Sequence, residues 1–481
     1  MNLLERTISA IHVPDGEIAA VVAAALRERM PTDFGRLNNT LLRYITITGE
    51  RHPAPPQASV VISCADHGVA VESVSAYPPE TTLNMMCNYL ITHGGAANAA
   101  ANYVGARLIV ADLGVNTDSV DIPGLLHRSI AHGTANMTKG AAMTRTQAIS
   151  AIETGIALAN ECADRSDRCI LPGEMGISNT TSSAAIVAAL LGLTPEEVTG
   201  RGANISDARL AHKIEIVRRA LGVNRPDPHD GLDVLAKVGG FELGCIAGLI
   251  LGAAARRVPV ILDGANTTSA ALIAHALAPN CAHYLLASHA SLTEHSHPHA
   301  LRRLGLTPML RLDIRLSEAT GSSIALRLLE QMLKVWKVLD AGEANHAFLA
   351  PPAGAGKGDR RVMEVVALHP PLPNQSVMSA CQYRLDNLAK PIHILGYLEQ
   401  LAGVIGCECP PRDMRAALLL LTKESELPAD LTSVLSVLTK THDIPVHIFS
   451  MQHETKDETD AKNTTYTIAC SYPLIILGTY G

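Results

Sequence analysis

The sequence predicts an α/β protein with a Rossmann-like, mainly parallel sheet flanked by helices. Short apolar runs typical of buried strands alternate along the chain with alanine-rich stretches of helical spacing. Hydrophobic residues make up 47% of the chain and aromatic residues only 3%, which suits helices packed tightly on a buried sheet. The 481 residues exceed the roughly 250–300 at which one core stops growing. We therefore expect two unequal domains.

Five apolar runs are the expected strands: 59–64, 106–114, 168–171, 258–264 and 283–289. Between them we expect helices, including an amphipathic helix at 144–163 and a buried helix, apolar nearly all round, at 244–257. Polar, glycine-marked segments follow all five strands. Ligands of parallel sheets bind at the carboxyl ends of the strands, so these five loops predict one cleft.

The segment 173–185, "GEMGISNTTSSAA", places a carboxylate and a glycine turn ahead of an apolar helix. Free amides at such a helix start can bind an anion, which suggests a site for a phosphorylated substrate. The alternative is a tight turn with a capping Asn or Thr. A second glycine turn begins "GRGANISDARLAHK" (200–213), whose Lys213 could meet a phosphate, although an isolated lysine more often lies at the surface.

Glu318 lies just before Thr320 and Gly321 at the start of an expected helix. It either stabilises the helix dipole or, if it faces the cleft beside apolar neighbours such as Leu316, acts as a general base. Four histidines between 289 and 299 match no standard zinc spacing, so we interpret their segment as a solvated loop. "GGFELG" (239–244) lacks the full dinucleotide-binding glycine pattern and is discounted.

Charge and composition exclude several classes of protein. The net charge is −7 without a cluster of Lys and Arg, which argues against a nucleic-acid partner. We find no apolar run of the roughly 18 residues that a spanning helix needs, and the acidic N-terminus is unlike a signal peptide. The ten cysteines form no CxxC pair and are expected to be buried, reduced thiols. We therefore expect a cytoplasmic protein without a membrane partner.

Seven stretches between about residues 55 and 345 together resemble one enzyme family, the nicotinate-nucleotide:dimethylbenzimidazole phosphoribosyltransferases. They are "ADHGVAVESVSAYPPE", "GTANMTKGAAMTRTQA", "GEMGISNTTSSAA", "GRGANISDARLAHK", "VLAKVGGFELGCIAGLILGAAARRVPVILDG", "LLASHASLTEH" and "LSEATGSSIAL". Each motif is weak alone, but all seven occur in the family's order, which makes the resemblance specific.

The resemblance implies a reaction. A pentosyltransferase of this family moves the phosphoribosyl group of nicotinate mononucleotide to dimethylbenzimidazole or a related base. Nicotinate leaves, and α-ribazole phosphate forms with inversion for the lower ligand of cobalamin. The resemblance also implies a smaller helical region beside the sheet and a homodimer acting on small molecules. An extra C-terminal α/β segment lies outside the matching stretches. The chemistry needs no cofactor and no metal. The alternative is a non-catalytic nucleotide-binding or regulatory paralogue.

The resemblance also implies roles for particular residues. Glu318 matches the catalytic base and Glu174 the second acid. The phosphate and nucleotide side is expected at Gly176, Asn179, Thr180, Gly202, Lys213 and Ser291, and the base pocket at Ser75, Tyr77, Asn84, Met175 and Leu316. Asn84 stands where the family usually has glutamine, and "GANTTSAA" (264–271) replaces the common "GFISTAAA". These departures leave open whether dimethylbenzimidazole, another benzimidazole, a purine or a phenol is the acceptor.

The domain division follows from the same comparison. We expect a catalytic domain at 1–348, a linker rich in Pro, Gly and Ala at 349–361, and a C-terminal segment at 362–481. "LDNLAKPIHILGYLEQLA" (385–402) copies the family's N-terminal run better than residues 26–42 do, and strand-like runs follow at 415–422 and 444–450. The segment lacks "DHGV", "SAYP" and a catalytic glutamate motif. We interpret it as a non-catalytic partial repeat of the N-terminal region, the alternative being an unrelated small α/β domain.

Overall fold

A computed structural model describes residues 1–29, 34–117, 121–203, 205–291, 293–312, 314, 316, 318–341, 416–422, 446–450 and 474–480. The chain divides into two compact units, Met1–Ala23 with Phe34–Met332 and Ala24–Asp33 with Leu333–Gly481. The expected linker at 349–361 and the run at 385–402 lie outside the described residues. The division at 348 and 361 therefore stays a prediction.

The first unit contains a sheet of six parallel strands in the order β3-β2-β1-β4-β5-β6. The strands are β1 (Ala58–Ala65), β2 (Arg107–Gly114), β3 (Leu126–His127), β4 (Cys169–Met175), β5 (Val260–Leu262) and β6 (Leu285–Ala287). This is the doubly wound order, in which the direction of winding reverses between β1 and β4. The predicted fold class is confirmed, and all five expected strands are present.

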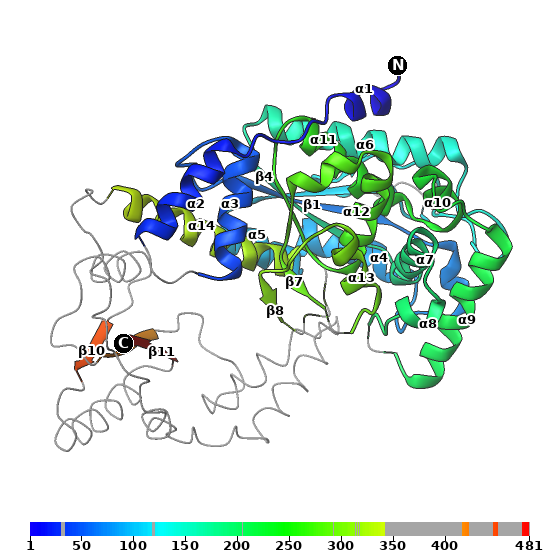
Figure 1. Cartoon of the computed structure of the whole chain (residues 1–481). Helices are drawn as coiled ribbons and strands as arrows, with labels where there is room; N and C mark the ends of the chain where they lie inside the picture. Colours follow the sequence, from blue (N-terminus) through cyan, green and yellow to red (C-terminus); the bar gives the residue numbers. More distant parts are fainter. Residues whose placement is uncertain are drawn as a thin grey trace, which may run out of the picture. The chain divides into compact units, whose positions relative to one another are not determined.

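Helices of the first unit lie on both faces of this sheet (Figure 1). Strand β1 is buried at every position. The described helices of the whole chain, of which α2 and α14 run across the boundary between the two units, are α1 (Leu3–Ser9), α2 (Glu17–Arg29), α3 (Arg36–Thr48), α4 (Thr81–Cys87), α5 (Ala96–Val104), α6 (Arg145–Asp164), α7 (Asn179–Leu191), α8 (Pro195–Val198), α9 (Asp207–Asn224), α10 (Gly231–Val238), α11 (Phe241–Ala255), α12 (Ala265–Leu277), α13 (Ser296–Arg303) and α14 (Thr320–Ala341). Shorter helical turns are η1 (Gly68–Glu72), η2 (Asn88–Thr92) and η3 (Pro279–Tyr284), and β7 (His289–Ala290) pairs with β8 (Leu310–Arg311).

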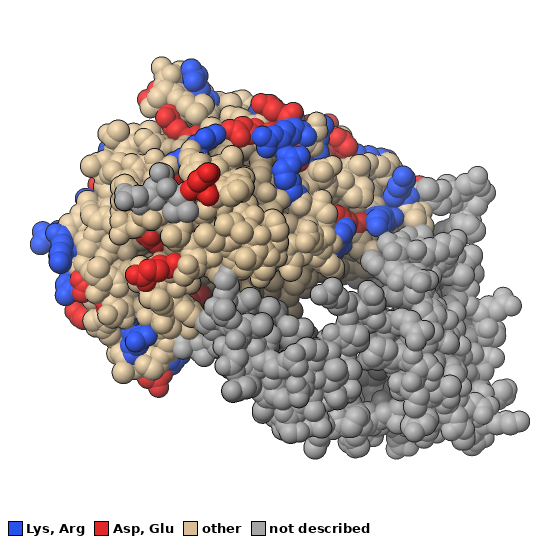
Figure 2. Space-filling model, turned by 180° about the vertical axis from the view of Figure 1, so that it is seen from behind, with Lys and Arg blue, Asp and Glu red and all other residues tan. Residues whose placement is uncertain are grey.

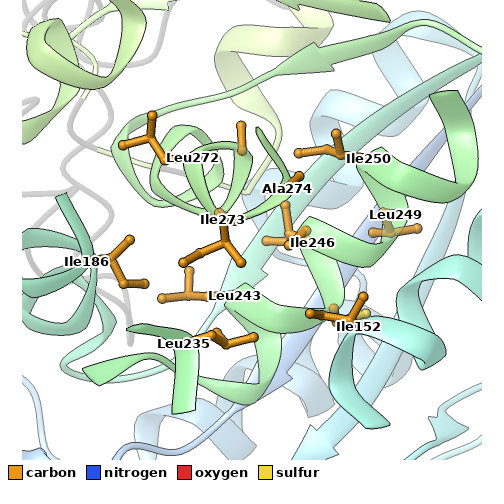
Figure 3. Close-up of a cluster of buried hydrophobic side chains, with 14 of the residues drawn as sticks. Ile152, Ile186, Leu235, Leu243, Ile246, Leu249, Ile250, Leu272, Ile273 and Ala274 are labelled. Carbon is orange, nitrogen blue, oxygen red and sulfur yellow. The ribbon is translucent and has the colours of Figure 1, made fainter. Parts of the chain in front are cut away.

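The core of the unit is built around α11, which is buried from Phe241 to Ala254 as its all-round apolar composition predicts. Figure 3 shows isoleucine and leucine side chains of neighbouring helices pointing toward one another, among them Ile152, Ile186 and Ile246. Burial of each such side chain contributes about 1.5–3 kcal/mol. The described cysteines are free thiols, and Cys87 alone among them is not fully buried.

Two glycines allow α6 and α11 to pack closely. A Cβ atom on Gly155 would lie 1.9 Å from the carbonyl oxygen of Cys245, and a Cβ on Gly248 would lie 1.9 Å from that of Ile152. No real Cβ atom approaches a backbone oxygen so closely. The backbones of the two helices can therefore meet at these positions only because a side chain is absent from both.

The second unit contains a parallel three-stranded sheet in the order β10-β9-β11. Its strands are β9 (Ala416–Thr422), β10 (Val446–Ser450) and β11 (Leu474–Tyr480). The first two confirm the strand-like runs expected at 415–422 and 444–450, whereas β11 was not expected from the sequence.

In the described part of the chain, no helix combines the length and the apolar composition needed to cross a bilayer. Acidic and basic side chains are interspersed on the face shown in Figure 2, and neither sign forms a continuous patch there.

Candidate active site

The candidate site lies at the point where the winding of the sheet reverses. Asp66 and His67 directly follow β1. Glu174 is the second-last residue of β4 and lies two residues before Gly176. A Cβ on Gly176 would lie 2.5 Å from the carbonyl oxygen of Ala65, so glycine lets the turn after β4 rest on the end of β1. The carboxyl ends of these two strands thus form the crevice that a doubly wound sheet uses for ligands.

Glu174 is buried, with 3% of its surface exposed, and amide groups hold both of its oxygens. Asn266 Nδ2 donates to Glu174 Oε1 at 2.8 Å, and Asn179 Nδ2 donates to Oε2. Asn179 is the first residue of α7. The second acid of the predicted site is therefore fixed by contacts from β4, α7 and α12.

Glu318 is held in a conformation that side chains rarely adopt. Its φ is +70° and that of Ala319 is +59°, both in the left-handed region, and Glu318 is 4% exposed. The backbone N–H of Ala97, at the start of α5, donates to Glu318 Oε2 at 3.2 Å. A left-handed non-glycine residue costs about 1–3 kcal/mol and persists where its surroundings enforce it, often at functional sites.

Glu318 lies two residues before the start of α14 at Thr320. Its carboxylate accepts a hydrogen bond from the N-terminus of α5, a contact that the sequence did not predict. Gly173 permits this placement, because a Cβ there would lie 3.2 Å from the backbone nitrogen of Ala319. The segment carrying Glu318 therefore packs on β4, directly before Glu174.

Asp263 stabilises the start of α14 and was not found from the sequence. It follows β5, and its Oδ1 accepts the N–H of Ser322 at 2.9 Å. Burial raises the pKa of Asp263 to about 7, although hydrogen bonds from Ser322, Gly321 and Ala319 oppose this rise. The side chain thus holds the turn on which Glu318 lies.

Lys213 lies on α9 and is buried, with 1% of its surface exposed, so it is not a surface lysine. Its Nζ donates to Thr180 Oγ1 at 2.8 Å and to the carbonyl oxygen of Gly200 at 3.2 Å. A Cβ on Gly202 would lie 3.4 Å from Nζ. Burial lowers the pKa of Lys213, and the charge of Glu294 opposes this. The structure thus brings Lys213, Thr180 and Gly202 together, as the sequence predicts.

Glu294 was not found from the sequence, although it lies in the loop of Ser291. Its Oε1 accepts the N–H of Gly202 at 2.6 Å and brings a negative charge beside the lysine. Ser291 is buried, and its N–H donates to His297 Nδ1 at 3.1 Å. Glu294 therefore fixes the glycine turn on which the predicted phosphate side depends.

The residues expected to bind the base are less enclosed. Ser75 and Tyr77 are half-buried in the loop after η1, where the N–H of Tyr77 donates to Ser75 Oγ at 3.2 Å. Met175 and Leu316 are half-buried, and Asn84 is exposed on α4. That these five residues line one pocket stays a prediction.

One face of α9 braces this loop. Arg209 donates to the carbonyl oxygen of Ser75 at 3.1 Å, and His212 Nε2 donates to that of Glu72 at 2.7 Å. Arg219 forms an ion pair with the carboxylate of Glu72. Hydrogen bonds from Asn136 and Thr138, together with Arg219, hold the pKa of Glu72 below its ordinary value. The spacing of Arg209, His212 and Arg219 places them on one face of a helix and could have indicated these contacts.

The interpretation of residues 289–299 as a solvated loop is wrong for two of the four histidines. His289 and His297 are each 1% exposed, and their rings meet edge to face with centroids 5.8 Å apart. The cause is α13, which begins at Ser296 and carries His297 inward with Ala300 and Leu301. Burial lowers the pKa of both histidines, that of His297 to about 3. His295 is exposed and His299 half-buried.

The discounted "GGFELG" segment supplies a buried ion pair. His67 Nε2 lies 2.7 Å from Glu242 Oε1, and both side chains are fully buried. Burial alone would lower the pKa of His67, but the charge and hydrogen bond of Glu242 outweigh it and raise the pKa. The segment therefore contributes a charge partner for the residue after β1.

These features define a doubly wound α/β protein with two buried carboxylates and a buried lysine around the crevice of its sheet. A family profile described as "Phosphoribosyltransferase" matches residues 11–345. The chain belongs to the nicotinate-nucleotide:dimethylbenzimidazole phosphoribosyltransferase family, as the motifs predicted.

Individual relatives agree with this assignment. Enzymes with that name from Chloroflexus aggregans and Geobacter metallireducens are 47% and 45% identical over 340 residues, which cover 70% of this chain and 95% and 96% of those proteins. The crystal structure of the enzyme from Thermus thermophilus is 38% identical with a TM-score of 0.63, and the match covers 67% of this chain and 96% of that one.

Proposed function

We propose that this protein transfers the phosphoribosyl group of nicotinate mononucleotide to dimethylbenzimidazole or a related aromatic base. An azole nitrogen attacks the anomeric carbon from the face opposite nicotinate. The bond from that carbon to the pyridinium nitrogen breaks, and its electron pair leaves with nicotinate. The products are nicotinate and an α-ribazole phosphate, as the names of the relatives support.

Glu318 is proposed as the general base that takes the N–H proton of the attacking azole. The observation that carries this role is its placement: the carboxylate is buried beside β4 and held by Ala97 in a strained left-handed conformation. Strain of this kind at the end of a parallel strand is typical of functional residues. A fixed base avoids the cost of orienting it during the reaction.

Lys213 is proposed to bind the phosphate of the mononucleotide, with Gly176, Asn179, Thr180, Gly202 and Ser291 around it. Buried ammonium groups need a negative partner, and the hydroxyl and carbonyl that Lys213 now contacts are neutral. The charge of Glu294 opposes the lowering of the Lys213 pKa by burial. Glu174, two residues before Gly176, would lie on the ribose side of the mononucleotide subsite. The base would bind among Ser75, Tyr77, Asn84, Met175 and Leu316.

The decisive assay mixes the protein with nicotinate mononucleotide and a panel of benzimidazoles, purines and phenols. Release of nicotinate with one class of base identifies the acceptor, and the anomeric configuration of the product, read by nuclear magnetic resonance, tests inversion. Binding of the mononucleotide without nicotinate release from any base would favour the alternative, a non-catalytic or regulatory paralogue. The presence of both buried acids supports the enzyme.

The proposal includes a homodimer in the cytoplasm, as the family resemblance implied. Sedimentation at micromolar concentration tests the assembly, because a monomer at all concentrations would contradict it. Fractionation of cells expressing the natural chain tests the location.

A further inference from the structure

Asn266 stands on the first turn of α12. Its Nδ2 donates to Glu174 Oε1 at 2.8 Å and lies 3.1 Å from Asn179 Oδ1. The exposed fractions of Asn266, Glu174 and Asn179 are 5%, 3% and 6%. A buried side-chain amide thus binds a buried carboxylate.

The orientation of this amide is fixed by a further pair of hydroxyl groups. Ser183 Oγ on α7 donates to Asn266 Oδ1 at 2.7 Å, so the carbonyl side of the amide accepts and the Nδ2 side is directed at Glu174. Ser269 Oγ lies 3.0 Å from Ser183 Oγ and 2.8 Å from the carbonyl oxygen of Asn266. The network joins α7 and α12 to the end of β4.

The two donors to Glu174 described above are side-chain amides. Amide N–H groups of Asn266 and Asn179 donate to its two oxygens, and donors of this kind favour the ionised form of a carboxyl group. An amide cannot give up a proton at neutral pH, so the two donors hold Glu174 as a hydrogen-bond acceptor. Glu174 is therefore poorly suited to take the proton of the attacking base.

We infer that Asn266 is a positioning residue that holds Glu174 as a fixed carboxylate in the mononucleotide subsite and leaves proton removal to Glu318. The inference rests on the proposed function for the role of the subsite, but the hydrogen-bonded pair itself can be tested without turnover. It predicts that disturbing Asn266 changes the KM for nicotinate mononucleotide and leaves the KM for the base unchanged.

The sharpest variant is Asn266→Asp, which replaces the donor by a second carboxyl group of the same shape. At low pH the pair shares one proton, and the protonated Asp donates to Glu174 as the amide did. At higher pH both groups ionise and repel each other. We expect a KM for nicotinate mononucleotide within about threefold of the natural protein at pH 5.5 and at least about tenfold higher at pH 8, a difference that one pKa unit accounts for.

The thermal midpoint of unfolding, Tm, tests the pair of Asn266 and Glu174 without a measurement of activity. The Tm of Asn266→Asp, relative to the natural protein, should fall as the pH rises from 5.5 to 8. The control Asn160→Asp adds the same charge on α6 beside Arg256 and should show no such fall. The double variant Glu174→Gln with Asn266→Asp exchanges the two groups, leaves one carboxyl group, and should remove the pH dependence.

A pH-independent difference in both KM and Tm for Asn266→Asp would overturn the inference. If Asn266→Asp is insoluble, Asn266→Ala is measured instead: a raised KM for the mononucleotide alone supports the role, and equal effects on both substrates contradict it. If the natural protein releases no nicotinate with any base, the proposed function fails, and the Tm comparison still decides whether Asn266 governs Glu174.

Discussion

The middle of the first sheet and the whole of the second sheet share one topology. In β2-β1-β4 and in β10-β9-β11, the strand that comes first in sequence is central, and two later strands flank it in parallel. The registers also correspond. Ala58 pairs with Cys169 and Ala416 with Leu474, and the glycines Gly173 and Gly478 follow at equivalent positions.

The two sheets differ at the next position. Glu174 follows Gly173 in β4, whereas Thr479 follows Gly478 in β11. The central strand β1 is followed by Asp66 and His67, and β9 by Lys423 and Glu424. Topology thus provides a crevice, but the residues at the strand ends decide its chemistry. The shared order supports our proposal that residues 362–481 are a non-catalytic partial repeat.

The largest expected effect concerns Glu318, for which we find no counterpart motif in the C-terminal segment. Glu318→Gln should lower kcat by about 100- to 10,000-fold, because only proton removal is lost. Nicotinate release measures the change, and mononucleotide binding should persist. Glu215→Gln on the exposed surface of α9 serves as a control. Turnover within about threefold of the natural protein would exclude Glu318 as the base and remove the main chemical difference between the two regions.

The second test concerns Lys213. It distinguishes a phosphate-binding role of this side chain in the first unit from a purely structural role. A charge-assisted hydrogen bond to phosphate contributes roughly 1.5–3 kcal/mol, so Lys213→Ala should raise the KM for nicotinate mononucleotide by about tenfold or more. The KM for the base should change little. The lowered pKa of Lys213 adds that mononucleotide binding weakens as the pH rises through that pKa. Equal changes in both constants would assign Lys213 to the fold.

The pH dependence of stability tests whether Asp263 holds the turn that carries Glu318. Its pKa is raised from 3.8 to about 7, so between these values the folded protein binds a proton that the unfolded chain does not. Its stabilising contribution is complete below about pH 4 and falls as the pH rises to about 7. Relative to Asp263→Asn, the natural protein should lose at most about 4 kcal/mol of stability across this window. A flat difference in Tm would contradict this assignment.

The smallest effect is expected from removing the second region. If residues 362–481 cover the catalytic domain, cutting within 349–361 should leave mononucleotide binding intact and weaken base binding or lower the Tm. Residues 1–350 expressed alone provide the measurement. A soluble fragment with unchanged Tm and unchanged kinetics for both substrates would mean that the second region is a tethered module.

The sequence predicted those parts of the molecule whose signal is local. Buried strands appear as apolar runs, and Glu174, Lys213 and Glu318 were singled out because they stand in glycine-containing motifs that resemble those of the family. Their roles stay predictions. Asp263 and Asn266 were missed as site residues because their partners are distant in sequence: 59 residues separate Asp263 from Ser322, and 92 separate Asn266 from Glu174. Strand β3 has only two residues and therefore no readable alternation. The burial of His297 was not predicted, because its segment is polar and only the helix α13 places this side chain in the core.

The contact between α6 and α11 has a consequence for how the molecule can move. Because Gly155 and Gly248 bring the two backbones together, neither helix can slide along the other without a backbone collision. We therefore expect little relative movement of these two helices. Hydrogen exchange on ligand binding should change in the segments after β1, β4 and β6, while the amides of α6 and α11 stay protected.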